Sequence, residues 1–306
     1  MNLIVSTSPH FRSRTDTSVI MRDVVIALIP AMIPAIIFFG IRSLFVTLTC
    51  VIAAVASEYI FEKCCKRPIT ISDWSAVVTG LLLAYNLPVG IPFWQAAIGS
   101  CVSIVLVKQL FGGIGRNFAN PAIVGRIVLI LSFSESMTIW KFPDGISTAT
   151  PLAVMKDGGA ATLSCFDLFI GKVGGCIGEV SVLALLIGFA YLLFRRVITW
   201  HTPVVFVGVV FILSWLIGGS AQYALLQIFA GGLMLGAIFM ATDYSTTPTT
   251  IPGQIVFALG AGLLTVLIRQ WGNYADGVSF AILFMNILTP YISRWTAAKP
   301  FGGVKA

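Results

Sequence analysis

The sequence predicts an all-α integral membrane protein with ten transmembrane helices, and three observations support this prediction. Of the 306 residues, 58% are hydrophobic and only 10% are charged, whereas a soluble domain carries roughly 25% charged residues. The mean hydropathy of the chain is +0.96. Apolar segments of helical length recur along the sequence between short polar turns, which is typical of a chain that crosses a bilayer repeatedly.

Ten apolar segments fit this pattern, because a spanning helix needs ~20 mostly apolar residues and somewhat fewer when it is broken. They cover residues 23–40, 44–61, 74–87, 92–110, 119–133, 176–194, 203–218, 221–241, 253–268 and 278–293. The sequence then divides into a cytoplasmic N-terminal segment, a five-helix half, a long extracytoplasmic loop, a second five-helix half and a cytoplasmic tail, at residues 1–22, 23–133, 134–175, 176–293 and 294–306.

The Lys and Arg residues assign the two sides of the membrane. With the N-terminus in the cytoplasm, thirteen of them face the cytoplasm, five face outward, and Arg126 lies inside a helix. The net charge of +7 therefore reflects membrane topology, and we expect no nucleic-acid partner. The polar N-terminus has no short apolar run ending in a cleavage site, so we expect no removable signal peptide.

Several predicted helices begin or end in turns rich in Pro, Gly and amide residues: LAYNLP (83–88), GGIGRNFANPA (112–122) and ATDYSTTPTTIPG (241–253). Lipid does not tolerate unpaired backbone groups, so such turns must line a cavity or a bound ligand. GLLLAYNLP (80–88) also faintly resembles GAIFMATDYSTTP (236–248). With five helices in each half, this echo predicts a 5+5 inverted repeat with broken helices.

Metal-binding residues are few. The six cysteines show no CxxC spacing and only two histidines exist, which argues against a zinc site or a protein-ligated iron–sulfur cluster. Asp243 is the one candidate cation ligand. It follows the eighth segment together with Thr242, Ser245, Thr246 and Thr247. Oxygen-rich, unwound backbone of this kind suits a sodium ion or a cytoplasmic flavin, and a helix-capping loop explains it equally well.

Two charged residues lie within or at the start of apolar segments. Arg126 lies about two turns inside the fifth helix, where a charge costs on the order of 3 kcal/mol and is by default a functional candidate. A structural ion pair with an acid such as Glu58 on the second helix is the alternative. Glu179 begins the sixth helix, where an acid complements the helix dipole.

The stretch DGISTATPLAV (144–154) interrupts the apolar sequence with three hydroxyl side chains. One interpretation is a Ser/Thr turn that caps the following helix. The other is a site where a threonine hydroxyl is esterified to the phosphate of flavin mononucleotide (FMN). Esterification needs an exposed hydroxyl, small neighbours and an acid for recognition, which Thr150, Ala149, Ser147 and Asp144 supply as D-G-x-S-x-A-T. Pro151 favours an extended Thr150, which would hold this side chain clear of any helix.

The stretch GRNFANPA (115–122) places two amides at the start of the fifth helix. Asn120 precedes a proline that suits the first helical turn, so a helix cap explains it. Amide side chains also both donate and accept hydrogen bonds, which suits the edge of an isoalloxazine ring. Asn117 and Asn120 are therefore candidates for a second flavin site.

Taken together, these stretches resemble the family formed by the D subunit of the Rnf electron transport complex and the B subunit of the Na⁺-translocating NADH:quinone reductase. The motifs are D-G-x-S-x-A-T, GGIGRNFANPA, GGCIGEVS (174–181), ATDYSTTPTT (241–250) and NYADGVSFAILFMN (273–286). The resemblance runs from Ser8 to the last helix, and the short N-terminal segment favours the Rnf branch. It implies a fold similar to that of urea and ammonium channels.

The resemblance also implies cofactors and partners. Covalent FMN would be carried on Thr150, and non-covalent riboflavin would lie near Asn117 and Asn120, with Arg126 as a further candidate. The chain would relay electrons in an ion-translocating (Na⁺ or H⁺) ferredoxin:NAD⁺ oxidoreductase, beside the Rnf subunits A, B, C, E and G, after a flavin transferase has modified it. It would have no enzymatic activity of its own and would be surrounded by lipid in the cell membrane.

Two other functions remain open from the residues alone. The chain could correspond to the B subunit of a Na⁺-translocating NADH:quinone reductase, or it could be a channel or transporter with a urea-channel-like fold. A scaffold protein without a cofactor is a third possibility. The D-G-x-S-x-A-T motif favours the redox function, since a channel has no use for it.

Overall fold

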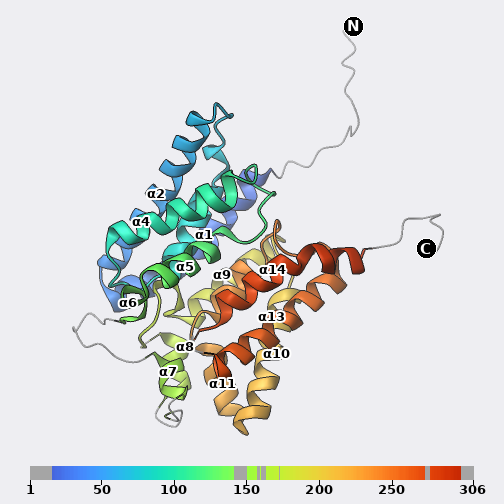
Figure 1. The fold of residues 1–306 in the computed structure, drawn as a ribbon. Helices are drawn as coiled ribbons and strands as arrows, with labels where there is room; N and C mark the ends of the chain where they lie inside the picture. Colours follow the sequence, from blue (N-terminus) through green and yellow to red (C-terminus); the bar gives the residue numbers. More distant parts are fainter. Residues whose placement is uncertain are drawn as a thin grey trace, which may run out of the picture.

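The structure, a computed structural model, describes residues 16–140, 150–156, 159, 163–171, 173–272 and 276–297. Every regular element within these ranges is helical, which confirms the predicted all-α class. The helices form two groups that lie side by side (Figure 1), one built from the first part of the chain (blue to green) and one from the last (yellow to red).

The first group begins with two long helices and continues with shorter ones. In chain order its elements are α1 (Thr17–Phe39), α2 (Arg42–Cys64), the 3₁₀ turn η1 (Ile71–Asp73), α3 (Ser75–Tyr85), α4 (Phe93–Val102), the π-helical segment η2 (Ser103–Gln109) and α5 (Pro121–Ser132). The segment between the groups, expected as a polar loop, contains short helices: α6 (Ser134–Thr138), α7 (Pro151–Lys156), α8 (Cys165–Ile170) and η4 (Ile177–Glu179).

The second group repeats the alternation of long and short helices. Its elements are α9 (Val182–Phe194), α10 (His201–Gly218), α11 (Ala221–Phe229), α12 (Leu233–Leu235), the π-helical segment η5 (Gly236–Met240), α13 (Ile251–Trp271) and α14 (Val278–Trp295). Each of the ten predicted apolar segments thus contains a helix. The eighth segment is broken, because α11 and α12–η5 meet at an angle of 68°.

The predicted count of ten crossings is not confirmed. Among the described residues, four helices (α1, α2, α10 and α13) are long and apolar enough to cross a membrane, or up to five if the bent pair counts as one span. The shorter apolar helices α3, α5 and α9 have 11 to 13 residues. At about 1.5 Å per residue they are shorter than a bilayer core of about 30 Å. Their ends therefore lie inside the protein, as the polar turns predicted.

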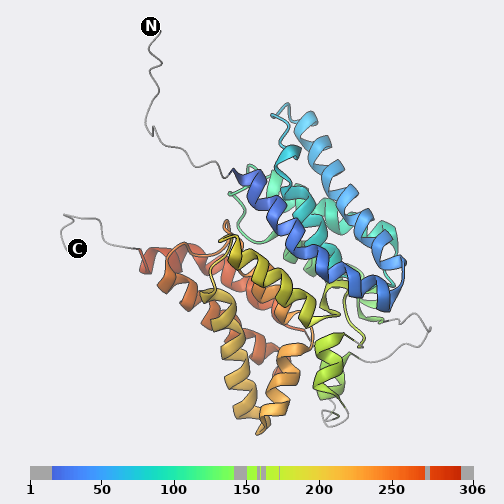
Figure 2. The ribbon, with the colours of Figure 1, turned by 180° about the vertical axis from the view of Figure 1, so that it is seen from behind.

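Equivalent helices pack alike in the two groups. In the first group α2 packs against α3 and α4, and in the second α10 packs against α11 and α13. The groups meet where α1 packs on α9 (Figure 2) and where α5 packs on α14. A Cβ atom at Gly188 of α9 would lie 2.3 Å from the carbonyl oxygen of Ala27 in α1. Only glycine allows this close approach, which is common between membrane helices.

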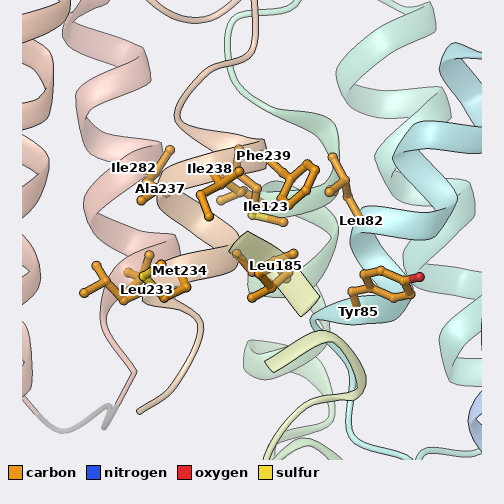
Figure 3. Close-up of a cluster of buried hydrophobic side chains, with 14 of the residues drawn as sticks. Leu82, Tyr85, Ile123, Leu185, Leu233, Met234, Ala237, Ile238, Phe239 and Ile282 are labelled. Atoms are coloured by element: carbon orange, nitrogen blue, oxygen red, sulfur yellow. The ribbon is translucent and has the colours of Figure 1, made fainter. Parts of the chain in front are cut away.

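The main hydrophobic core lies between the two groups and draws on both. Figure 3 shows side chains from α3, α5, α9, α12, η5 and α14 converging there; those labelled are Leu82, Tyr85, Ile123, Leu185, Leu233, Met234, Ala237, Ile238, Phe239 and Ile282. Tyr85, the last residue of α3, donates a hydrogen bond to the carbonyl of Leu28 in α1, at 2.8 Å. This buried bond ties the end of a short helix to its long neighbour.

Candidate functional site

Helix α5 lines two cavities, one at its start and one in its second half. Asn120 caps the helix, because its Oδ1 accepts hydrogen bonds from the backbone N–H groups of Ala122 (3.0 Å) and Ile123 (3.4 Å), and Pro121 occupies the first helical position. The predicted cap is confirmed. Six residues further on, Arg126 is buried, with 4% of its surface exposed.

The cavity at the start of α5, called the amide cavity below, has a volume of about 80 Å³. Its polar wall consists of Ser75, Thr79, Lys108, Asn117, Asn120, Thr242, Asp243, Tyr244 and Ser245. Its apolar wall consists of Ile20, Met21, Val24, Val78, Leu82, Ile114, Pro121, Leu192, Val197, Ile198 and Phe239. The structure thus brings together Asn117, Asn120 and Asp243, which the sequence offered as separate candidates.

The amide cavity presents an unused acceptor. The Oδ1 atom of Asn117 is buried and has no hydrogen-bond partner among the described residues. The backbone N–H of Asn120 is satisfied by Asn286 of α14, whose amide accepts from it at 3.1 Å and donates to the carbonyl of Thr246 at 3.2 Å. Asn286 therefore joins the start of α5 to the turn after η5, so both walls are held in place.

Asp243 lies in that turn and is held by its own loop. Its carboxylate accepts hydrogen bonds from the hydroxyls of Ser245 and Thr246, both at 3.1 Å. Burial raises the pKa of Asp243, and the bonds from Ser245 and Thr246 oppose this shift. In the described part of the chain no group of three or more His, Cys, Asp or Glu residues is arranged to hold a metal ion. The sodium interpretation stays a prediction.

Lys108, which sequence analysis counted only as a cytoplasmic charge, is a buried residue of this cavity with 2% of its surface exposed. It lies in the π-helical segment η2, and such distortions are frequent at functional sites. Its Nζ donates to Glu58 Oε1 of α2 at 2.6 Å and to Ser75 Oγ of α3. A lysine within an apolar segment, next to a glutamine, was the signal that could have revealed it.

The second cavity, called the arginine cavity below, has a volume of about 140 Å³. It is lined by Arg126, Ile130, Met137, Thr138, Trp140, Thr150, Pro151, Leu152, Gly174, Gly175, Glu179, Gly231, Asp276, Gly277, Ser279 and Phe280. Two predicted site residues, Thr150 and Arg126, therefore share one cavity, although 23 residues separate them in sequence.

Arg126 is bound from every side. Its Nη1 donates to Asn86 Oδ1 at the end of α3 (2.7 Å) and to Ser279 Oγ of α14 (3.1 Å). Its Nη2 forms an ion pair with Asp276 Oδ2 at 2.9 Å and lies 3.8 Å from Glu179 Oε1. The predicted alternative, a pair between Arg126 and Glu58, is wrong, because Glu58 pairs with Lys108 instead.

A second buried arginine supports the same site. Arg269 of α13 donates to the carbonyl oxygens of Gln227 and Ala230 at the break between α11 and α12. It also donates to the carbonyl of Asp276 (3.1 Å), and its Nη2 lies 3.8 Å from Asp276 Oδ1. Sequence analysis assigned Arg269 to an outward loop, but only 5% of its surface is exposed.

Thr150 begins helix α7 at the wall of the arginine cavity. Its Oγ1 accepts a hydrogen bond from the backbone N–H of Ala153 at 3.2 Å, and its carbonyl accepts from Val154. The prediction that the side chain stands clear of any helix is wrong, because the hydroxyl caps α7. Thr150 is half-buried. The motif residues Asp144, Ser147 and Ala149 lie outside the described residues.

Comparison with known proteins identifies the family. The chain matches the NQR2, RnfD, RnfE family over residues 4–302. It belongs to this family. The D subunit of the Na⁺-translocating ferredoxin:NAD⁺ oxidoreductase complex from Acetobacterium woodii is 46% identical over 100% of this chain and 97% of its own length.

Two further relatives agree. The D subunit of the proton-translocating ferredoxin:NAD⁺ oxidoreductase complex of Clostridium ljungdahlii is 44% identical over 97% of this chain and 96% of its own length. The D subunit of the ion-translocating oxidoreductase complex of Alcanivorax borkumensis is 37% identical over 99% of this chain and 97% of its own length. The resemblance drawn from the motifs is thereby confirmed across the chain.

Proposed function

We propose that this chain is the flavin-carrying D subunit of an ion-translocating ferredoxin:NAD⁺ oxidoreductase complex. The full-length relatives bear that name. The observation that carries the flavin part of the proposal is the position of Thr150, which lies at the wall of a cavity that also contains the buried Arg126, Glu179 and Asp276. Enzymatic activity then belongs to the complex, and this chain contributes a relay within the membrane.

Thr150 is the attachment point that we propose for FMN. Capping of α7 does not oppose esterification, because an oxygen in a phosphoester keeps a lone pair for the N–H of Ala153. Gly174, Gly175 and Gly231 line the same cavity and leave room beside the hydroxyl. Trp140 and Phe280 provide aromatic surface there, against which a planar ring packs favourably.

The residues of the arginine cavity fit a flavin chemically. Arg126 Nε and Glu179 Oε1 are buried without a hydrogen-bond partner among the described residues. They offer one donor and one acceptor, and the edge of an isoalloxazine ring requires both. FMN supplies the electron-transfer chemistry when bound; the chain positions it and sets its potential through hydrogen bonds and local charge.

A second, non-covalent riboflavin in the amide cavity completes the proposal. The unpartnered Oδ1 of Asn117 and the apolar walls suit a planar ring with polar edges. The cavity alone, at about 80 Å³, accommodates part of such a ligand. It shares Asp243, Tyr244 and Ser245 with a wider hollow of about 430 Å³, which leaves space for the rest.

We further propose the membrane arrangement that the sequence suggested. Both termini face the cytoplasm, residues 134–175 face outward, and the two groups form an inverted repeat. Two buried cations, Lys108 and Arg269, no longer count as loop charges. Twelve basic residues against four remain, so the bias persists. The like packing of α2 and α10 supports the repeat. The partners that we propose are the Rnf subunits A, B, C, E and G, a flavin transferase and lipid.

One experiment on the purified complex tests the flavin proposal. The chain should show ultraviolet-excited flavin fluorescence on a denaturing gel, with a mass increase equal to esterified FMN on the peptide that contains Thr150. Acid extraction should release riboflavin in addition. A chain with neither signal would contradict the redox function and favour a channel or scaffold.

A further inference from the structure

Lys108 occupies a position that a purely structural ion pair does not require. It is among the largest fully buried side chains of the protein, and both Lys108 and its hydrogen-bond partner Ser75 line the amide cavity. The ammonium group is therefore located at the wall of this cavity. Removing a lysine ammonium from water is costly unless its hydrogens are bound, so the partners of each hydrogen matter.

The hydrogen bonds of Lys108 leave one donor unused. An ammonium group carries three N–H donors. Within the described residues, Glu58 Oε1 accepts one and Ser75 Oγ accepts another. The third has no acceptor among these residues, and the cavity is the free space beside it. The same wall contains the buried and unpartnered acceptor of Asn117. One unused donor and one unused acceptor therefore border one cavity.

The anion beside Lys108 is held rigidly. Glu58 is 0% exposed, and its Oε1 also accepts from Gln109 Nε2 at 2.8 Å. Gln109 in turn donates to Glu62 Oε1 at 3.2 Å, and the backbone N–H of Thr70 donates to Glu62. Glu58 therefore fixes the position of the ammonium group and partly cancels its charge as sensed from the cavity.

We propose that Lys108 is a ligand-binding residue of the amide cavity, which donates its third hydrogen bond to an acceptor on the edge of a planar heteroaromatic ring, while Glu58 positions it and reduces the positive potential there. This inference rests on the proposed second flavin and adds its charged contact. A nearby cation stabilises the reduced, negatively charged form of a flavin, and a nearby anion does the opposite. Lys108 and Glu58 thus act on the flavin potential in opposite directions.

The test uses four single variants of the complete complex: Lys108→Gln, Lys108→Arg, Glu58→Gln and, as a control, Lys63→Gln at an exposed position of the same helix as Glu58. The measurements are acid-extractable riboflavin per chain, the midpoint potential of that flavin in a redox titration, and the melting temperature. Lys108→Gln should weaken riboflavin retention roughly tenfold, since it removes a charged hydrogen bond, and should lower the potential of the remaining flavin.

Glu58→Gln should shift the potential upward, because it removes the opposing anion. Lys108→Arg should retain flavin better than Lys108→Gln, and Lys63→Gln should change nothing. If either Glu58→Gln or Lys108→Gln fails to fold, the double variant Glu58→Gln/Lys108→Gln keeps a neutral hydrogen-bonded pair. It should regain stability without regaining riboflavin.

The outcomes separate this inference from the function on which it rests. No extractable flavin in the unaltered complex would overturn both. Normal flavin in the unaltered complex, with unchanged retention and potential in Lys108→Gln, would overturn the role of Lys108 alone. A double variant that regains both stability and flavin would also overturn it, since Lys108 would then be structural only.

Discussion

The amide cavity and the arginine cavity are built on one plan with different chemistry. Each lies at the start of a helix that begins inside the protein: Asn120 caps α5 beside the amide cavity, and Asp276 precedes α14 beside the arginine cavity. The two helices pack together. Asn286 of α14 contacts the start of α5, and Arg126 of α5 contacts the start of α14, so the helices run in opposite directions.

The difference between the cavities lies in their charge. The arginine cavity has two buried guanidinium groups, Arg126 and Arg269, arranged around Asp276 and Glu179. The amide cavity has neutral amides and hydroxyls and one buried ion pair at its wall. Oriented donors at the start of a broken helix can thus support either a charged or a neutral site. What each site binds is decided by the residues that face the helix start.

The largest effect should come from the residue that only the arginine cavity has. Thr150→Val should abolish fluorescence of the denatured chain, because no oxygen remains for a phosphoester, while Thr148→Val should leave it largely intact. Thr150→Ser keeps both the hydroxyl and the cap of α7, so it should retain at least part of the signal. Fluorescence that survives in Thr150→Val would move the attachment to another hydroxyl.

Breaking the charged network should cost more stability than any change at the neutral site. Arg126→Met leaves Asp276 and Glu179 buried without their cation, and losing one partner of a buried pair costs about 3–5 kcal/mol. The melting temperature in detergent measures this loss. Arg195→Gln, which breaks the exposed pair with Asp23, is the matched control and should have a far smaller effect. Equal losses in both variants would mean that the network contributes no special stability.

The neutral cavity should lose its ligand without affecting the other. Asn117→Leu combined with Asn120→Leu should remove acid-extractable riboflavin while the fluorescence from Thr150 persists. The loss of the α5 cap costs about 1 kcal/mol, so Asn117→Leu with Asn120→Ser retains a capping hydroxyl and isolates the effect on binding. A covalent signal that falls together with the free flavin would show that the cavities do not act separately.

The smallest expected effect concerns Asp243 at the edge of the amide cavity. Its pKa is raised by burial, so the folded state binds this proton more tightly than the unfolded state does. Its contribution to stability is present below the ordinary carboxyl pKa of about 3.9 and is lost as the pH rises through the raised value. Asp243→Asn removes this ionisation, so the variant should lose less stability over that pH range. Parallel melting curves against pH would contradict the prediction.

The sequence predicted the helices and their ends better than the contacts between them. Apolar segments and breaks such as LAYNLP depend on local composition, and the structure has a helix in each segment and a cap at Asn120. A charge in an apolar segment signals a buried partner but does not name it. The partner of Arg126 is Asp276, 150 residues away, and no spacing rule connects them.

Counting charges at segment ends had a similar limit. Lys108 and Arg269 were taken as loop residues because each lies near the end of an apolar run, yet both are buried in the folded protein. The ten crossings failed confirmation for a related reason, since helices such as α3 and α5 are too short to span alone. Hydropathy finds the segment, and tertiary packing decides how much of it is helical.

Helix α5 also sets the distance over which the two cavities sense each other. Arg126 follows Asn120 by six residues, which corresponds to a rise of about 9 Å. Two unit charges about 10 Å apart at an effective dielectric constant of about 20 interact by about 1.7 kcal/mol, more than a tenfold change in an equilibrium. Charge that arrives at one cavity therefore changes the affinity of the other for charge, and this coupling is reciprocal.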